Sequence, residues 1–387
     1  MQRTTGEYIL SSTVGEPVNA FVPFALPPEP PIAMDSLFPL LDRANQALGR
    51  LDGFSMLLPA PRLFLYNYVR KEAVLSSQIE GTQSSLSDLL LFEMNVAPGV
   101  PLEDVQEVSS YMKAMNHGLK RLREGFPISL RLIREMHQAL LSDGRGADKT
   151  PGEFRRSQNW IGGTRPGNAI YVPPPPDRLM ECLDRLEKFL HDDSQTLPLL
   201  VQLALIHVQF ETIHPFLDGN GRLGRLLITL LLCSRGALRA PHLYLSLYFK
   251  THRSTYYDLL QKVRIEGAWE EWLEFFLVGV AETATEAANT ANQLMQLFEE
   301  DRSRIKEIGR AGPTALLVHE YMQKRPAFTI GMVASDVHLS IPTVSKTLAR
   351  LSDLGIVREI TGQERNRVFV YESYMDSLSS GTEPIKP

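Results

Sequence analysis

The chain has 387 residues, of which 43% are hydrophobic and 22% are charged, and its formal net charge is -5. This length allows two or three domains, and the composition is that of a soluble globular protein rather than a disordered or fibrous one. The acidic balance argues against a chain that binds nucleic acid or anionic membranes through its overall charge.

Cysteine usage and the apolar segments restrict the cellular setting. Cys182 and Cys233 are the only cysteines, which excludes a disulfide framework and favours a reducing cytosol, so we expect a cytoplasmic protein. The first residues lack the basic and apolar regions of a signal peptide. The longest apolar stretch, residues 226–233, is too short to cross a bilayer, so we expect no membrane contact.

The N-terminal part begins with a proline-rich stretch of about 35 residues, which we expect to lie extended over the surface. Helical patterns follow at 36–51, 61–79 and 104–122. The second of these ends in SSQIEG, where Ser76 and Glu80 are four residues apart and therefore share a helical face. A solvated polar helix end is the plain alternative.

The middle of the chain is predicted to be helical with one exception. Residues 130–141, 177–191 and 197–214 have helical patterns, and Pro215 predicts that the last of them ends at His214. Between the first two, residues 160–172 contain two short strand-like runs around a Gly/Pro-rich turn. We expect a lone β-hairpin there.

The C-terminal part follows a long helix rich in Ala, Thr and Glu. Two helical patterns at 331–340 and 342–356 form a helix-turn-helix pattern, and two strand-like runs about a polar turn come next. This order predicts a winged-helix domain. Lys346 and Arg350 could meet DNA, but acids and bases are about balanced here, so protein interaction or dimerisation remains an equal alternative.

The densest chemistry lies in IHPFLDGNGRLGR, residues 213–225. His214 ends a helix, where its imidazole can face a cavity. Gly219 and Gly221 flank Asn220, and glycines so placed let backbone N–H groups converge on an anion. The next helix begins at this point, and its N-terminus favours negative charge.

Charged residues complete this segment. Arg222 and Arg225 are three residues apart on one helical face and suit phosphate oxygens, and Asp218 is an oxygen ligand of the kind that Mg²⁺ prefers. A base, a metal ligand, an anion cradle and two cations together predict transfer of a phosphorus-centred group. Each part alone is more often structural.

A rival site involves the preceding helix. His207, Glu211 and His214 lie at i, i+4 and i+7 and could bind a metal from one helical face. Their spacing is not that of the H-E-x-x-H motif, and His207 is expected to pack toward the core. No Walker A sequence is present, which excludes a P-loop enzyme.

The string HPFLDGNGRLGR matches the signature of the Fic family at every defined position, and the chain resembles that family from about residue 36 to the long helix. It departs from the Doc branch, which has Ala and Lys where this chain has Gly219 and Gly221. The resemblance implies a mainly α fold, a Fic-type helical bundle with a β-hairpin flap, to which the small C-terminal winged-helix domain is added. It also implies AMP transfer from ATP to a Tyr, Thr or Ser hydroxyl of a target protein.

The resemblance implies four segments. Residues 1–110 would form an N-terminal helical region, 111–285 the catalytic core, 286–310 a connector helix and 311–387 the winged-helix domain. Self-modification and a homodimer are compatible with this arrangement. A DNA-binding regulator with a nucleotide-sensing core, and an enzyme that removes AMP, are the alternatives.

The same resemblance implies roles at the start of the motif. His214 would be the base that takes the proton from the target hydroxyl, and Asp218 would hold Mg²⁺ that binds with ATP. Phe216 would be a buried anchor for the loop. Each of these roles is assigned to the residue at the matching position of the motif.

The rest of the motif is implied to bind phosphates. Gly219, Asn220 and Gly221 would cradle the α- and β-phosphates. Arg222 would hold them from the helix, and Arg225 would reach the γ-phosphate. These five positions are the expected ATP site.

The nucleoside pocket is less defined. We expect it in the aromatic segment that contains His252 and Tyr257, with core packing as an equal alternative. The flap is implied to include Trp160, Ile161, Gly162 and Gly163. An exposed hairpin edge there could pair with an extended target segment.

SSQIEG also fits the inhibitory-helix signature of the family, with Ser76, Glu80 and Gly81 in the defined places. Its position ahead of the core resembles the branch whose inhibitor lies in the same chain. The resemblance implies that Glu80 pairs with Arg225 and blocks the γ-phosphate site. Ser76 would orient the Glu80 side chain.

Overall fold

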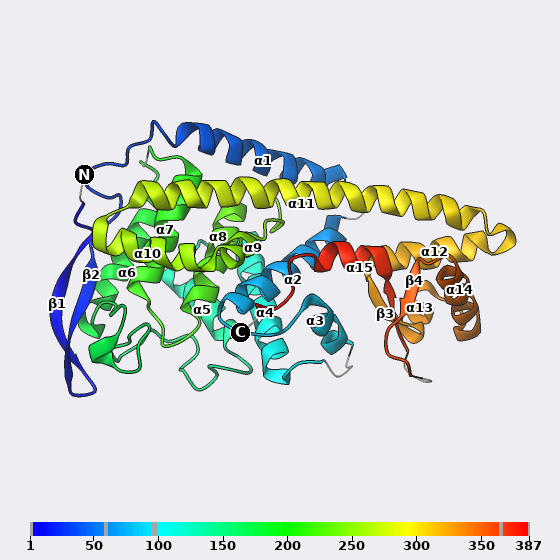
Figure 1. The fold of residues 1–387 in the computed structure, drawn as a ribbon, viewed down its shortest axis with the longest axis horizontal. Helices are drawn as coiled ribbons and strands as arrows, with labels where there is room; N and C mark the ends of the chain where they lie inside the picture. Colours follow the sequence, from blue (N-terminus) through cyan, green and yellow to red (C-terminus); the bar gives the residue numbers. More distant parts are fainter. Residues whose placement is uncertain (1–2, 58–60, 95–98, 195, 364–366, 386–387) are drawn as a thin grey trace.

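The computed structural model describes residues 3–57, 61–94, 99–194, 196–363 and 367–385, but not the side chains of residues 55–57 and 61–66. The molecule is mainly helical and elongated (Figure 1). The helices up to the motif are α1 (Phe38–Leu57), α2 (Pro61–Ile79), α3 (Leu86–Glu93), α4 (Leu102–Arg123), α5 (Leu130–Leu140), α6 (Pro176–Leu190) and α7 (Leu199–Ile213). The later helices are α8 (Asn220–Ser234), α9 (Ser246–Thr251), α10 (Arg253–Glu266), α11 (Trp269–Lys306), α12 (Gly312–Lys324), α13 (Ile330–Val337), α14 (Ile341–Asp353) and α15 (Glu372–Ser379).

The centre of the molecule is built around α7 and α8. Both helices are apolar on nearly every face, and almost all of their residues are buried. A helix of this kind must be enclosed by others. α4 and α5 pack on α8, while α10 and α11 pack on α7. The loop that joins α7 to α8 carries the motif, so the bundle fixes this loop at both ends.

The longest element is α11, which spans 38 residues and runs beside α1 along the molecule (Figure 1). The expected connector, 286–310, is therefore only the second half of a helix that begins at Trp269. The expected boundary after residue 110 likewise falls inside α4. These boundaries lie within continuous helices because apolar residues continue across them and are buried against the core.

The N-terminal stretch differs from the expectation that it lies extended over the surface. Strands β1 (Gly6–Thr13) and β2 (Glu16–Pro23) form an antiparallel hairpin. Its two-residue turn has positive φ at Val14 (50°) and Gly15 (79°), as the tight turns that suit twisted hairpins require. A β-branched residue is rare in that conformation, so the sequence Val-Gly does not predict a tight turn.

The expected hairpin at 160–172 is mostly irregular. One bridge joins Ile161 to Tyr171, and a 3-10 turn, η1 (Pro166–Asn168), lies between them. The segment is also not alone, because the Phe21 amide of β2 donates to the Val172 carbonyl at 2.8 Å. The flap thus extends the N-terminal hairpin. Positive φ at Gly162 and Gly163 interrupts regular strand pairing.

The C-terminal unit comprises α12, α13 and α14 with a three-stranded antiparallel sheet in the order β3-β5-β4. The strands are β3 (Ala327–Thr329), β4 (Val357–Glu359) and β5 (Val368–Tyr371). Residues 364–366 of the turn before β5 lie outside the described residues. Helix α15 then follows β5 directly and contacts α2 and α3 (Figure 1). Among the described residues, none of the helices combines the length and apolarity that a membrane span needs.

Candidate functional site

The motif forms a compact loop between two helix ends. His214 caps α7 in the left-handed conformation, with φ 49°, and Pro215 prevents a further helical turn. Gly219 is also left-handed, with φ 75°, and precedes the first residue of α8. Inside the loop, the Asn220 amide group both donates to the Phe216 carbonyl and accepts from its N–H, each at 2.9 Å. These bonds fix the side chain and leave one N–H of Asn220 Nδ2 unused by the described residues.

Phe216 anchors the loop from below. Its ring is fully buried and stacks on His137 of α5 at a centroid distance of 3.7 Å. His137 Nδ1 accepts from the Gly152 amide at 2.8 Å, so Nε2 carries the proton and donates to the Asp218 carbonyl at 3.0 Å. Burial lowers the pKa of His137 to about 4, which keeps this ring neutral. His137 is thus the residue on which Phe216 packs in its predicted role as an anchor for the loop.

Arg155 supports the loop from the flap side. Its side chain is buried and donates to the His214 carbonyl at 2.9 Å and to the Pro174 carbonyl at 2.5 Å. Its amide also donates to the Pro215 carbonyl at 3.0 Å. Arg155 and His137 could not be recognised from the sequence, because an arginine in a loop and a histidine in an amphipathic helix carry no signal of such contacts.

His214 is half-buried at the mouth of the loop. Burial, together with the positive charges of Arg155 and Arg264, lowers the pKa of His214 to about 3. The imidazole is therefore neutral near pH 7, as a group that accepts a proton must be. Its Nδ1 makes no hydrogen bond within the described part of the chain.

Asp218 lies beside the start of α8. Its Oδ1 accepts from the Gly219 amide at 2.6 Å and is 3.5 Å from Arg222 Nη2. The other oxygen, Oδ2, takes no hydrogen bond from the described residues and faces Gly146, where a Cβ would lie only 2.8 Å away. A partly exposed carboxylate with one free oxygen fits a Mg²⁺ ion that phosphates also bind.

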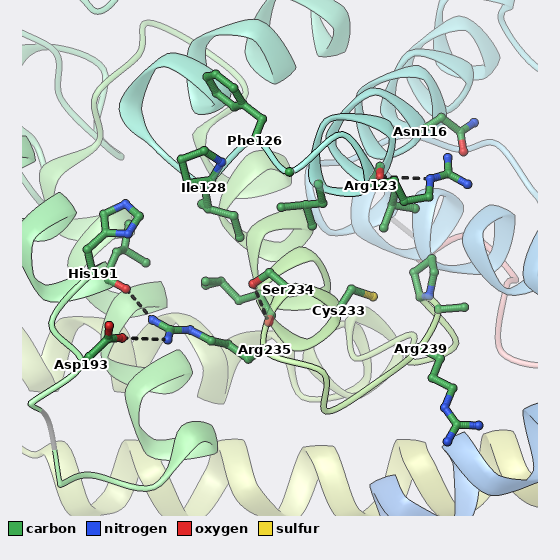
Figure 2. A pocket seen from close by; sticks show the side chains of 18 residues that line it. Asn116, Arg123, Phe126, Ile128, His191, Asp193, Cys233, Ser234, Arg235 and Arg239 are labelled. Atoms are coloured by element: carbon green, nitrogen blue, oxygen red, sulfur yellow. Dashed lines mark hydrogen bonds and ion pairs between the residues drawn. The ribbon is translucent and has the colours of Figure 1, made fainter.

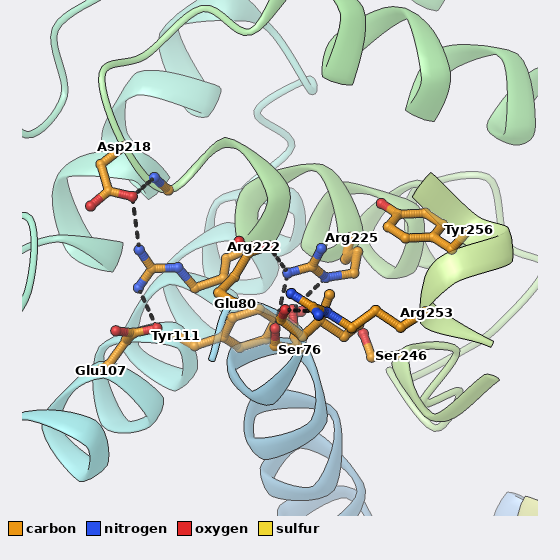
Figure 3. A network of polar contacts seen from close by, with 12 residues as sticks. Ser76, Glu80, Glu107, Tyr111, Asp218, Arg222, Arg225, Ser246, Arg253 and Tyr256 are labelled. Atoms are coloured by element: carbon orange, nitrogen blue, oxygen red, sulfur yellow. Dashed lines mark hydrogen bonds and ion pairs between the residues drawn. The ribbon is translucent and has the colours of Figure 1, made fainter. Parts of the chain in front are cut away.

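Arg222 is held by two carboxylates (Figure 3). Its Nη1 lies 3.0 Å from Glu107 Oε1 of α4, and both side chains are only 2% exposed. The contact with Asp218 is longer. Arg222 Nε and Nη1 form no well-directed hydrogen bond with the described residues, so donors remain for an anion at this position.

Arg225 meets the segment that carries Glu80 (Figure 3). Its Nη2 donates to Glu80 Oε1 at 2.7 Å and to the Ser76 carbonyl at 2.9 Å, and its Nε donates to Ser76 Oγ at 2.9 Å. The Arg225 side chain is 1% exposed and that of Glu80 is 30% exposed. α2 ends at Ile79, and Gly81 has φ 105°, so Glu80 sits at the turn that leaves the helix.

Glu80 is ionised in this position. Burial disfavours its charge, but the ion pair and hydrogen bond with Arg225 outweigh burial and lower the pKa of Glu80. Its carboxylate also lies directly against the start of α8, since a Cβ on Gly221 would be 2.3 Å from Oε1. A negative group thus lies against the first turn of α8, close to the helix N-terminus, and a helix N-terminus favours an anionic ligand.

The rival metal site is not supported. His207 Nε2 pairs with the Tyr256 hydroxyl at 2.9 Å, and its ring stacks on Trp272 and Phe249 inside the core, as expected for a structural histidine. Burial raises the pKa of Glu211 to about 7. Within the ranges that the structure describes, no group of three or more His, Cys, Asp or Glu side chains could hold a metal ion.

The two residues expected at the nucleoside pocket have different surroundings. His252 is exposed at the junction of α9 and α10 and packs on Tyr248 at 4.5 Å. Tyr257 packs on Tyr256, and burial and the charge of Glu80 raise its pKa to about 12. Tyr257 therefore lies near the motif, whereas the contacts of His252 are those of ordinary packing.

The flap residues lie on the N-terminal hairpin. Trp160 packs with Val18 and Ala20 of β2, and the Ile161 amide donates to the Tyr171 carbonyl at 2.8 Å. Gly163 approaches Asn168 so closely that a Cβ would lie 2.4 Å from its carbonyl oxygen. Glycine is needed there for space as well as for its positive φ.

A cavity of about 650 Å³ lies at the opposite end of α8 from the motif (Figure 2). Three of the arginines that line it bind the protein itself. Arg123 donates to the Leu119 carbonyl at 3.3 Å, Arg235 donates to the Leu190 carbonyl at 2.6 Å, and Arg239 pairs with Asp52. Basic side chains at helix C-termini stabilise the free carbonyls there. The charges of this cavity are thus explained by the fold.

Comparison with known families agrees with this geometry. Residues 38–120 match the model described as Fic/DOC family N-terminal, and residues 127–232 match the Fic/DOC family model. The first match contains Glu80 and the second contains the whole motif. Residues 38–120 and 127–232 are therefore similar, in this order, to the two Fic/DOC family models.

Curated relatives include proteins named protein adenylyltransferase Fic. The protein from Drosophila sechellia is 32% identical over 200 residues, which cover 51% of this chain and 37% of the relative. The protein from Drosophila yakuba is 28% identical over 261 residues, covering 62% of this chain and 50% of the relative. The chain thus spans half or less of these relatives.

Solved structures share the fold. A Fic family protein from Desulfovibrio desulfuricans superposes with a TM-score of 0.59 at 20% identity, covering 88% of this chain and 97% of that protein. A Fic domain containing signaling protein from Bacteroides thetaiotaomicron has a TM-score of 0.52 at 18% identity, with 64% and 95% covered. The helical bundle described above is therefore a Fic fold.

Proposed function

We propose that this protein is a protein adenylyltransferase, which transfers AMP from ATP to a hydroxyl side chain of a target protein, and that Glu80 inhibits it. The observation that carries the proposal is the ion pair between Glu80 and Arg225 at 2.7 Å, directly in front of the N-terminus of α8. The Drosophila relatives, named protein adenylyltransferase Fic, support the same reaction class. The whole motif is intact, which a scaffold would not need.

The chemistry follows from the positions of the side chains. The oxygen of the target hydroxyl attacks the α-phosphorus of ATP, the bond from that phosphorus to the β-phosphate oxygen breaks, and pyrophosphate leaves. The hydroxyl proton passes to the neutral His214 imidazole. General-base catalysis of this kind contributes roughly a hundred- to ten-thousand-fold in rate. Arg155 holds the His214 carbonyl at 2.9 Å and so fixes where the ring lies.

Phosphate binding is assigned to the start of α8. Gly219 and Gly221 lie at the N-terminal end of α8, where Glu80 Oε1 lies against Gly221, and Arg222 and Arg225 supply positive charge. Mg²⁺ bound with ATP would be held by Asp218 and would neutralise phosphate charge. We expect the target segment to lie along the flap near Ile161, where an exposed edge can pair with an extended chain.

Inhibition follows from competition for Arg225. A γ-phosphate and the Glu80 carboxylate carry charge of the same sign and both require this guanidinium, so they exclude each other. ATP that binds while Glu80 is in place must keep its γ-phosphate elsewhere, and its α-phosphate is then turned away from in-line attack. The wild-type protein should therefore transfer AMP slowly.

The test uses purified protein, Mg²⁺ and ATP labelled at the α-phosphate, with a cell lysate as the source of targets. Glu80→Gly protein should attach AMP to lysate proteins or to itself, as identified by mass spectrometry. Glu80→Gly/His214→Ala protein is the control and should attach none while still binding ATP. Absence of AMP adducts with Glu80→Gly protein would overturn the proposal. Loss of AMP from previously modified proteins would point to the reverse reaction instead.

A further inference from the structure

The segment after α15 returns from the C-terminal unit to the helix that carries the inhibitory residues (Figure 1). There the Gln78 Nε2 group donates to the Thr382 carbonyl at 2.8 Å. Lys250 of α9 donates to the carbonyls of Gly381, at 2.9 Å, and Glu383. Gln78 and Thr382 are each 1% exposed, so this is a buried contact and not a loosely attached tail.

Gln78 lies between the two residues that hold Arg225. It is two positions after Ser76 and two before Glu80, at the last turn of α2. Its Nε2 group also donates to the Ser84 carbonyl at 2.8 Å. One amide group therefore joins the end of α2, the turn that follows Glu80 and the segment from the C-terminal unit.

A second buried contact joins the same two parts. Asn67 Nδ2 of α2 donates to the hydroxyl of Tyr374 in α15 at 2.7 Å, and both residues are fully buried. Helix α15 follows β5 without a loop, and the Tyr371 hydroxyl at that junction donates to Asp301 of α11. The C-terminal sheet thus continues directly into α15, and α15 is joined to α2 by a hydrogen bond between buried groups.

Besides the bonds from Arg225, two further hydrogen bonds hold the turn that carries Glu80 to other helices. The Gln83 amide donates to Asp104 Oδ2 at 2.8 Å. Arg253 donates to the Ile79 carbonyl at 3.0 Å. Within the described part of the chain, however, the hydroxyl oxygens of Ser77, Thr82 and Ser84 have no hydrogen-bond partner. A buried polar group without a partner is unfavourable. The bonds from Gln78 and Arg253 therefore matter for keeping this turn in place.

We propose that residues 381–383 form a latch, which holds the Glu80 turn against Arg225 and couples the C-terminal unit to the active site. A partner that binds the C-terminal unit and shifts α15 would break the bonds to Gln78 and Lys250, free the turn and release Arg225 for ATP. The effect on activity rests on the function proposed above. The latch itself consists of contacts between residues 381–383 and the helices α2 and α9, so it can be tested without measuring catalysis.

The activity test removes the latch by truncation after Ser380. Truncation should raise AMP incorporation about fivefold, which corresponds to about 1 kcal/mol, and should change nothing in a Glu80→Gly background. Lys250→Met removes one anchor and keeps the chain length, so it should give a smaller increase and none on top of truncation. Truncation after Ile385 is the matched control, because it shortens the chain but keeps residues 381–383, and it should behave as wild type.

The second readout is hydrogen exchange at the amides of Glu80, Gly81 and Thr82, which donate to the carbonyls of Ser77 and Gln78. Truncation and Lys250→Met should speed exchange there and leave the buried amides of α8 protected, which also verifies that the variants fold. Faster exchange without AMP transfer in any variant would uphold the latch and reject the proposed function. Unchanged exchange in both folded variants would overturn the latch, whatever the activity. If the α8 amides lose protection in the truncated protein but not in Lys250→Met, the exchange rates of Lys250→Met alone decide whether the latch exists.

Discussion

The Glu80 carboxylate and the Gly221 backbone are in direct contact, so close that a methyl group on Gly221 would lie 2.3 Å from Glu80 Oε1. The contact joins a residue at the end of α2 to the first turn of α8. It means that the Glu80 carboxylate lies against the first turn of α8, in addition to pairing with Arg225. Both features favour an anion there, whether carboxylate or phosphate.

The first prediction concerns Glu80 itself. Glu80→Gly should raise auto-adenylylation at least about tenfold, because losing a charged hydrogen bond of ~1.4 kcal/mol or more changes a rate by that factor. Incorporation of label from α-labelled ATP measures it. Arg225→Ala should not mimic the effect, since it removes the phosphate contact together with the ion pair. Equal incorporation by wild type and Glu80→Gly would return this turn to a plain polar helix end.

The second prediction asks whether Gly221 provides room for the phosphates of ATP or only for the Glu80 carboxylate. In a Glu80→Gly background, Gly221→Ala should lower AMP incorporation by about tenfold or more, equivalent to ~1.4 kcal/mol, because the methyl group would meet the phosphates where it now meets the carboxylate. ATP binding should weaken in parallel. If the double variant is as active as Glu80→Gly alone, Gly221 serves only to accommodate Glu80.

The third prediction concerns the buried pair of Arg222 and Glu107, 3.0 Å apart. Glu107→Ala should lower the free energy of unfolding by about 3 kcal/mol, because it leaves a buried guanidinium whose remaining ion pair, with Asp218, is longer at 3.5 Å. Urea unfolding gives the value. The Glu107→Ala/Arg222→Met double variant should lose less than the sum of the two single losses by at least ~0.5 kcal/mol. Strict additivity would show that the pair contributes no coupling.

Sequence reasoning succeeded where the information is local or contiguous. The motif lies in twelve consecutive residues, and the end of α7 before Pro215 follows from proline sterics. The predicted contact between Glu80 and Arg225 is present, although 145 residues separate them, because a second short signature marked Glu80. The winged-helix assignment stays a prediction, although the described elements occur in the expected order.

What the sequence did not reveal depends on contacts between distant segments. Arg155 binds the carbonyl of His214, and Gln78 binds the carbonyl of Thr382. Every residue has a main-chain carbonyl, so the residue type does not show which carbonyl will accept such a bond. The β1–β2 hairpin was missed because Val14 adopts a positive φ that β-branched residues avoid. The flap lacks regular strands because Gly162 and Gly163 adopt positive φ, which interrupts strand pairing.

The fourth prediction concerns the C-terminal unit. On α14, Val344 and Leu348 are buried while Lys346 is exposed, so this helix offers a charged outer face. If the unit binds DNA, a labelled duplex should bind the full chain at low salt, and Lys346→Ala should weaken binding and reduce the salt slope by about 1. Lys306→Ala, on the exposed end of α11, is the control. No binding at low salt would remove DNA from the account.

The fifth prediction uses the buried carboxyl of Glu211. Burial raises its pKa to about 7, the charge of Glu80 raises it as well, and Arg225 and Arg264 lower it in part. The folded protein therefore keeps a proton on Glu211 at pH values where the unfolded chain, with a pKa near 4.5, has lost it. The contribution of Glu211 to the free energy of unfolding should therefore fall as the pH rises from about 4.5 to about 7 and level off above that, by as much as ~3 kcal/mol at 1.36 kcal/mol per pH unit.

Glu211→Gln isolates this contribution, because glutamine has the shape of the protonated carboxyl and does not titrate. Its melting temperature relative to wild type should be lowest near pH 5 and should rise steadily to about pH 7, since the other titrating groups are common to both proteins and cancel. Thermal unfolding monitored by circular dichroism at half-unit pH steps gives the difference curve. A flat curve would mean that Glu211 is ionised in the folded protein, and a curve of opposite slope would mean that Arg225 or Arg264 stabilises its charge.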